Sequence, residues 1–463
     1  MSDPANAAKT AKEDALVHEH GLRVTWRPPS TTPGGSNTSA IAGAGTFAVE
    51  EAATKRESVI GVLHSAAEIE HGILIEYLYA AASLIDPDAA MLVTSVAIEE
   101  MGHLLTVQNI LLAVGAEPYL GRQDQAPSDP FDPFPFRLEP ATLGTIACYV
   151  AAESPDSAEL SFFENRELNR IRRVADSQIQ SESRRKPSGP LLNRVGVLYD
   201  HLLKVFTEAD ADQLCVGLKT NRNRQASKEE AWAHGGEGRA VIVQEIGSLA
   251  DLVGALHAVA GQGEGFECAE NSHFHRFRRL YRGMRRRRWI PDGLAYQSAT
   301  QPLRRLRWIW RALGVYDPAL QSSVKAERID TEGKQLVRLL SLRYQLALLT
   351  IRLVLERGRG EQSRRALIDL LLRDMALILP PLATACSRQV SRDSTARPYE
   401  LPKGVPAATL AARKAQLRQA IADSAELCSQ LRHGTQSYLW NVFQTITECD
   451  RQRNQVLGPE HAE

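Results

Sequence analysis

Apolar positions in this chain recur mostly every three or four residues, which is the period of an α-helix with one buried face. One such stripe runs through residues 58–84, and Pro87 closes it. A second stripe covers residues 89–114 and stops at Gly115, a residue typical of helix C-termini. The two stretches therefore predict a long helical hairpin.

Helical periodicity continues along most of the remaining chain, with two exceptions. Residues 154–190 are polar and predict no definite element, and residues 209–246 carry turn signals and the β-like run AVIVQEI, so we expect a small hairpin there. The further predicted helices cover residues 141–152, 191–206, 248–257, 266–284, 303–313, 325–355, 363–384 and 407–431, with a last segment ending at residue 457.

Composition limits the kinds of partner that this chain would bind. Lysine plus arginine and aspartate plus glutamate each total 55, so no overall field attracts nucleic acid or an anionic membrane. No apolar stretch resembles a signal peptide or a long uncharged membrane span, and we expect a cytoplasmic protein without a membrane partner. The six cysteines include no CxxC pair, which disfavours a thiolate metal cage.

Two ExxH pairs carry the candidate chemistry. Glu100 and His103 lie in the second predicted helix and Glu270 and His273 in a later one, and each pair falls within the apolar stripe of its helix. Glu70 is a further acid in the apolar stripe of the first helix. A lone ionised carboxylate in a protein core costs several kcal/mol, so acids and imidazoles that share one interior require a cation.

Oxygen ligands combined with imidazoles suit iron, our first choice, or manganese. A single ExxH pair is more often a helix-boundary feature or is satisfied by an arginine. Two pairs plus an inward-facing Glu, in the order E, ExxH, ExxH, match a carboxylate-bridged di-metal bundle.

The sequence resembles the ferritin-like domain of the iminophenyl-pyruvate dimer synthases of violacein-type and bisindole biosynthesis, over about residues 55–405. The resemblance implies an all-α fold: a ferritin-like four-helix bundle with additional C-terminal helices. It also implies that Glu70, Glu100, His103, Glu270 and His273 bind the metal and are catalytic. The stretches that carry it are EIEHGILIEYLYA, VAIEEMGHLLTVQNILLAVGAEP, VGVLYDHL, GQGEG, ENSHFHRF and, weakly, LPPLATACSRQVSRDSTARPYELP.

One departure from the family pattern bears on the number of metal ions. The third family helix usually has Gly-Glu-hydrophobic-Tyr, whereas this chain has Val197 at the glutamate position. Asp200 could replace the missing acid, although a solvated position is the simpler interpretation, so one or two ions remain open. We expect His64, His71, Glu99, Glu153 and Glu264 to be solvated, capping, structural or supporting residues.

A run of arginines follows His273 and is interpreted first as a solvated or salt-bridged face. A sharper hypothesis is that Arg276 and Arg279 hold a substrate carboxylate, because guanidinium groups bind carboxylates with two parallel hydrogen bonds. The full run consists of Arg276, Arg278, Arg279, Arg282, Arg285, Arg286, Arg287 and Arg288.

These patterns divide the chain into a disordered arm (1–54), a metal-binding bundle with irregular insertions (55–290) and a C-terminal helical extension packed on it (291–463). The expected function is a non-haem iron oxidoreductase of natural product biosynthesis that uses dioxygen on an amino-acid-derived imine or related small nitrogenous acid. The alternative is a non-catalytic metal-binding or scaffold protein. A partner biosynthetic enzyme and a homodimer also stay open.

Overall fold

The computed structural model describes most of the helical part of the chain. The described residues are 16–17, 23–27, 46–50, 54–84, 86–122, 136–156, 158–182, 194–231, 241–263, 271–286, 331–389, 398–401, 409–432 and 439–458.

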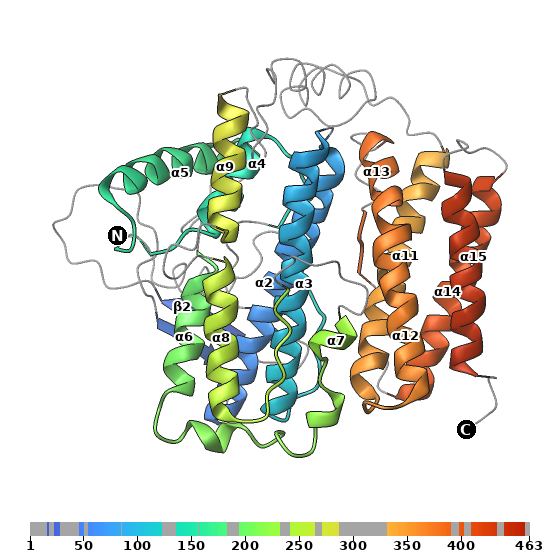
Figure 1. The fold of residues 1–463 in the computed structure, drawn as a ribbon, viewed down its shortest axis with the longest axis horizontal. Helices are drawn as coiled ribbons and strands as arrows, with labels where there is room; N and C mark the ends of the chain where they lie inside the picture. The colour runs from blue at the N-terminus through green and yellow to red at the C-terminus, as the bar shows by residue number, and fades with distance from the viewer. Residues whose placement is uncertain are drawn as a thin grey trace, which may run out of the picture.

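The predicted long hairpin is confirmed as α2 (Lys55–Ser83) and α3 (Pro87–Ala113), which pack along their length (Figure 1). Thr54 begins α2 with a capping box, because its side chain accepts from the Glu57 amide and Glu57 accepts from the Thr54 amide. Asp86 caps α3, whose first residue is proline. Both helix starts are therefore specified locally by the sequence.

The other half of the bundle consists of two helices that are each divided into two pieces. The first comprises α4 (Leu143–Ala152) and α6 (Gly196–Phe206), and the second comprises α8 (Leu249–Gly263) and α9 (His273–Arg285). The amide of Val195 donates to the carbonyl of Ala152 at 3.1 Å, so α6 begins where α4 ends. Figure 1 shows α4 beside α9 and α6 beside α8, at opposite ends of the hairpin.

A long insertion separates α4 from α6 and contains α5 (Phe162–Glu182), for which the sequence predicts no definite element. Its apolar stripe is narrow and lies in a highly charged segment, so its period is hard to see. The buried members of the stripe are Leu168, Ile171, Ala175 and Ile179. Part of its stability comes from another helix, because Arg278 of α9 pairs with Glu164 and Glu167 of α5.

The β-like run is not a hairpin strand over its described residues 241–246, which corrects that expectation. These residues run along α3 and bond to its side chains: Thr106 donates to the carbonyl of Ile242, and Asn109 donates to that of Gln244. A Cβ on Gly102 would lie 2.6 Å from the Ile242 carbonyl oxygen. Glycine at this position permits the close approach of the segment.

Between α6 and α8, the described chain contains three short helical turns. They are η1 (Ala211–Leu214), η2 (Arg222–Arg224) and α7 (Lys228–Ala231).

The C-terminal helices form a second bundle beside the hairpin (Figure 1). They are α11 (Thr331–Glu356), α12 (Gln362–Arg373), the π-helical turn η4 (Asp374–Ile378), α13 (Leu379–Gln389), α14 (Leu410–Arg432) and α15 (Trp440–Leu457). The predicted helix at 303–313 lies outside the described residues. Contact with the hairpin includes α13 packed on α2 and a hydrogen bond between His71 and Tyr344.

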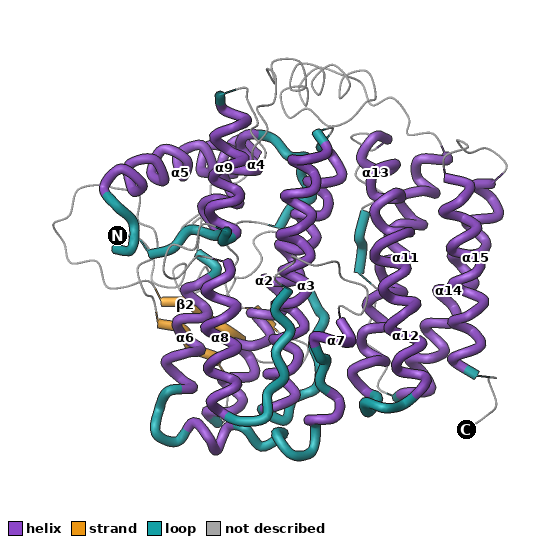
Figure 2. The backbone as a smooth tube through the Cα atoms, in the orientation of Figure 1, coloured by secondary structure: helices purple, strands orange, loops and turns teal. Residues whose placement is uncertain are grey.

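Three short strands lie within the segment expected to be a disordered arm (Figure 2). They are β1 (Leu16–Val17), β2 (Arg23–Arg27) and β3 (Thr46–Glu50), paired antiparallel in the order β1-β2-β3. These strands correct the expectation of disorder at their positions. They were hard to predict because sequences as short as RVTWR and TFAVE have too few alternating apolar and polar residues to reveal the two-residue period of a strand. For the rest of 1–54, the expectation stays a prediction.

By length and composition alone, α2 and α3 are apolar enough to cross a membrane. The most apolar window of α2 is 89% buried inside the protein, and that of α3 is 61% buried. Core helices pass the same test, so this is weak evidence for a membrane span.

Candidate metal centre

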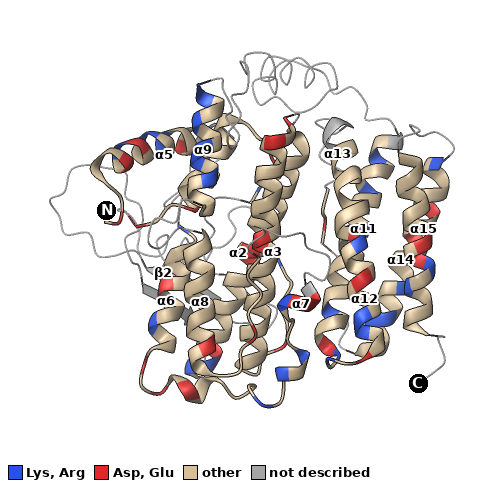
Figure 3. Ribbon diagram, viewed as in Figure 1, with Lys and Arg blue, Asp and Glu red and all other residues tan. Residues whose placement is uncertain are grey.

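The structure brings Glu70 of α2 together with Glu100 and His103 of α3 in the middle of the hairpin. All three side chains are at most 2% exposed. Figure 3 shows acidic residues in the middle of this largely uncharged pair of helices. The helical spacing of Glu100 and His103 places both on the face of α3 that packs on α2, which is why an i, i+3 pair can act together.

Glu100 lies between two imidazoles. Its Oε2 is 2.8 Å from Nδ1 of His103, and its Oε1 is 2.8 Å from Nδ1 of His273, at the start of α9. The two imidazole rings are stacked, with centroids 5.4 Å apart. Each oxygen of this carboxylate thus lies beside a different imidazole nitrogen, so each oxygen–nitrogen pair would be available to hold one ion.

Glu153 provides a carboxylate that sequence reasoning placed among the solvated or supporting residues. It caps the C-terminus of α4 and is only 1% exposed, which corrects the solvated interpretation. Its Oε2 lies 3.7 Å from Nδ1 of His273. The signal in the sequence was an acid directly after the strongly apolar helix LGTIACYVAA. The third bundle helix therefore contributes an acid from α4, although Val197 replaces the expected one in α6.

The donors form two groups, each with atoms within 4.8 Å of one another. We call Glu70, Glu100 and His103 the His103 position, and Glu100, Glu153 and His273 the His273 position.

Buried tyrosines hold the outer carboxylate of each position. The Tyr77 hydroxyl donates to Oε1 of Glu153 at 2.6 Å, and the Tyr199 hydroxyl donates to Oε1 of Glu70. In both cases the other carboxylate oxygen, Oε2, is the one that approaches a histidine Nδ1. The tyrosines therefore orient each carboxylate with one oxygen turned toward the neighbouring imidazole.

The far side of each imidazole has its own partner. Nε2 of His273 is 3.0 Å from Oε2 of Glu99, and Nε2 of His103 is 3.0 Å from the side-chain oxygen of Gln262. Arg276 binds Glu99 through both terminal nitrogens. When Nε2 carries the proton and donates it to these partners, Nδ1 presents a lone pair for a metal.

The buried acids and imidazoles of this centre shift one another's pKa values. Burial, with help from Glu100, raises the pKa of Glu70 to about 7. Burial alone would lower the pKa of His103, but Glu100 and Glu70 outweigh it and raise that pKa to about 10. The pKa of His273 is likewise raised, against burial, by Glu100. The pKa of Glu100 is well below its usual value, because the two imidazoles outweigh the effect of burial.

The residues present fit a pair of metal ions. Oε2 of Glu70, Oε1 of Glu100 and Nδ1 of His273 are buried without a well-oriented hydrogen-bond partner, which is costly in a protein interior. Carboxylate oxygens and imidazole nitrogens are the donors that iron and manganese accept. Four of the five donors, Glu70, Glu100, His103 and Glu153, line a small cavity with room for about one water-sized particle.

Other predicted site residues lie elsewhere or are not described. Asp200 is half-buried on α6 and belongs to neither donor group. Its pKa is raised by burial. Glu270 and Glu264 lie outside the described residues, so the second ExxH pair is represented only by its histidine.

The two histidines of α2, His64 and His71, contact residues outside both donor groups. His64 stacks on Tyr119, and His71 lies 3.2 Å from the carbonyl of Gly121.

The arginine run is largely paired where the structure describes it. Arg278 and Arg282 pair with Glu167, and Arg276 pairs with Glu99, so the geometry gives Arg276 a partner within the protein. Arg279 is half-buried, and Arg287 and Arg288 lie outside the described residues. The role of Arg276 and Arg279 in holding a substrate carboxylate stays a prediction.

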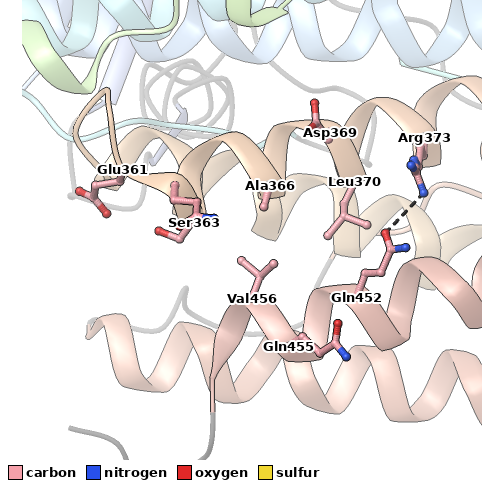
Figure 4. A pocket seen from close by; sticks show the side chains of 10 residues that line it. Glu361, Ser363, Ala366, Asp369, Leu370, Arg373, Gln452, Gln455 and Val456 are labelled. Atoms are coloured by element: carbon pink, nitrogen blue, oxygen red, sulfur yellow. Dashed lines mark hydrogen bonds between the residues drawn. The ribbon is translucent and has the colours of Figure 1, made fainter.

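The C-terminal bundle has a more open groove between α12 and α15 (Figure 4). Apolar side chains such as Leu370 and Val456 line it, and Arg373 donates to Gln452 at 3.4 Å. None of its residues belongs to either metal-capable group found among the described residues. Among the described residues, both groups that could hold a metal lie in the first bundle.

Comparison with known proteins agrees with this arrangement. Residues 63–282 match the family model named Ferritin-like, a range that includes the whole donor cluster. This part of the chain is a ferritin-like domain. Its four-helix core, with acids and ExxH histidines facing inward, confirms the all-α, ferritin-like fold expected from the sequence.

A solved structure similar to this chain is that of a ferritin like protein from Caulobacter vibrioides. It has 16% sequence identity and a TM-score of 0.39, and the match covers 72% of this chain and 96% of that one. No curated protein matches the sequence.

Proposed function

We propose that this chain is a non-haem iron enzyme that binds two ions at the His103 and His273 positions and uses dioxygen as co-substrate. The observation that carries the proposal is Glu100, whose two carboxylate oxygens each lie 2.8 Å from a different histidine Nδ1. Glu70 and Glu153 supply one outer carboxylate to each position. Bound iron would supply Lewis-acid and redox chemistry.

The chain's own residues would orient and protect this centre. Tyr77 and Tyr199 fix the two outer carboxylates, and the small cavity limits access by water. The cavity is too small for a large organic ligand in the described arrangement. A centre this enclosed favours a small co-substrate such as dioxygen.

The proposed metal rests on the geometry of the site, whereas the proposed substrate class rests on sequence resemblance. An amino-acid-derived imine or related small nitrogenous acid, and a role in natural product biosynthesis, are suggested by the sequence resemblance to the imine dimer synthases. Coupling or oxygenation of such a substrate in the cytoplasm, with or without a partner biosynthetic enzyme, completes the proposal.

The test begins with protein purified without oxygen and loaded with ferrous iron. We expect about two ions per chain, and faster oxygen uptake when candidate amino-acid imines are added. Glu100→Ala should abolish tight binding at both positions, because it removes the shared ligand. Asp200→Asn, which changes an acid on α6 outside both donor groups, should bind iron like the natural protein.

Two outcomes would count against the enzyme. A folded protein that binds no iron and takes up no oxygen would favour the scaffold alternative. Iron binding that survives Glu100→Ala but is lost in Asp200→Asn would place the metal elsewhere.

A further inference from the structure

We infer that the two metal positions are unequal, and that Glu99, held by Arg276, makes the His273 position the tighter one. This inference rests on the proposed metal centre, because it concerns the order in which its two positions fill. It concerns binding, so metal affinity can test it without any measurement of turnover.

The donors themselves give little reason for a difference. Each position has one histidine Nδ1, one oxygen of Glu100 and one outer carboxylate. Each outer carboxylate also receives a hydrogen bond from a buried tyrosine, Tyr77 for Glu153 and Tyr199 for Glu70. A difference in affinity must therefore come mainly from groups beyond these ligands.

At the His273 position, the group beyond the imidazole is an anion fixed on two sides. Oε2 of Glu99 is 3.0 Å from Nε2 of His273, and Glu99 is only 5% exposed. Arg276 binds both oxygens of Glu99 and also lies 3.2 Å from the Ser95 hydroxyl. The acceptor is thus charged, buried and unable to turn away from His273.

At the His103 position, the corresponding group is neutral and more exposed. Gln262 lies in the last turn of α8 and is only half-buried. Its side-chain oxygen is 3.0 Å from Nε2 of His103. A carboxylate acceptor increases the basicity of a metal-bound imidazole more than an amide does, and a fixed acceptor orients the ring better. Both effects favour the His273 position.

The experiment titrates the metal-free full chain with Co²⁺, whose visible absorption reports on its ligands, and measures bound metal by equilibrium dialysis. We expect two steps. His273→Ala should remove the tighter step, and His103→Ala should remove the weaker one. These two variants assign each step to a position before the partners are changed.

Reciprocal substitutions then test the cause of the inequality. Glu99→Gln should weaken the tighter step by about 10- to 100-fold and leave the other step near its original value. Gln262→Glu should strengthen the weaker step. A role that is merely structural would weaken both steps together, so the split between them is the informative readout.

Arg276 provides an independent test as a positioning residue. Arg276→Ala should weaken the tighter step in the same direction as Glu99→Gln, and Arg276→Lys should recover part of the loss. Arg282→Ala is the matched control, because Arg282 lies on the same helix but pairs with Glu167. This control should bind Co²⁺ like the natural protein.

Three results would overturn the inference. They are two steps of equal affinity, a tighter step that persists in His273→Ala, and a Glu99→Gln protein whose two steps are unchanged. Each would leave the proposed metal centre intact, because two ions would still bind. A natural protein that binds no Co²⁺ would instead overturn the proposed centre and this inference together.

Discussion

Two clusters of buried charge occupy the two bundles of this chain, and they are satisfied in different ways. In the C-terminal bundle, Arg343 and Arg453 pair with Asp374 and Asp450, and each arginine contacts both aspartates. Two cations meet two anions, so the charges cancel. In the ferritin-like domain, carboxylates instead meet imidazoles that can give up their protons.

The difference lies in what each cation can do. A guanidinium group stays protonated and cannot bind a metal, whereas an imidazole becomes a ligand once its Nδ1 is free. Burial of charge alone is therefore no sign of a metal site. The informative feature is a set of buried acids whose partners are themselves metal ligands.

The strongest test of this comparison is to break the self-balanced cluster. Arg343→Met should lower the free energy of unfolding by about 3–5 kcal/mol, because it leaves buried aspartate charge without its partner. The double variant Arg343→Met/Asp374→Leu should recover much of this loss, since the Asp450–Arg453 pair at 3.1 Å remains. Urea denaturation of the metal-free proteins measures both effects.

Equal unfolding free energies for the natural protein and Arg343→Met would show that the cluster contributes nothing. A double variant that is less stable than the single one would contradict the charge-balance account.

The second test uses pH, to which the two clusters should respond differently. The pKa of His103 is about 10, so at pH 7 a metal ion that binds must displace a proton from its imidazole. The pKa of Glu70 is about 7, so about half of the molecules must also lose a proton from this carboxyl group. Binding releases these protons, so apparent affinity at the His103 position should rise with pH. The increase should be about tenfold per pH unit for each proton displaced, and steeper below pH 7.

Co²⁺ affinity measured in His273→Ala between about pH 6 and 9 isolates this position. An affinity that does not change with pH would mean that His103 and Glu70 are not the ligands. The arginines of the C-terminal cluster should stay charged throughout this pH range, because a guanidinium group does not titrate there.

The smallest expected effects concern the tyrosines. Tyr77→Phe removes the hydrogen bond to Glu153 and should weaken the His273 position by about fivefold, which corresponds to about 1 kcal/mol for one hydrogen bond. Tyr199→Phe should have a similar effect on the His103 position, through Glu70. Co²⁺ titration of each variant resolves the two steps.

If each tyrosine variant weakened both steps equally, the tyrosines would support the general packing of the core instead of individual ligands.

Much of the ferritin-like domain could be predicted from the sequence, because the signals that specify a helix are local. The apolar period of residues 58–84 and 89–114, with breaks at Pro87 and Gly115, predicted the hairpin, and the i, i+3 spacing placed Glu100 and His103 on one face. The apolar period of α2 likewise predicted that the side chain of Glu70 faces the core. In the C-terminal half, however, the predicted helix 363–384 is divided by a π-helical turn at Asp374, which pairs with the buried arginines.

Tertiary structure alone decided which acid completes the centre and which arginine supports it. Glu153 joins His273 because α4, which Glu153 caps, packs against α9, which begins at His273. Arg276 contacts Glu99 because α9 packs against α3. A helical period fixes the direction of a side chain relative to its own helix, but the neighbours it meets depend on how distant segments pack.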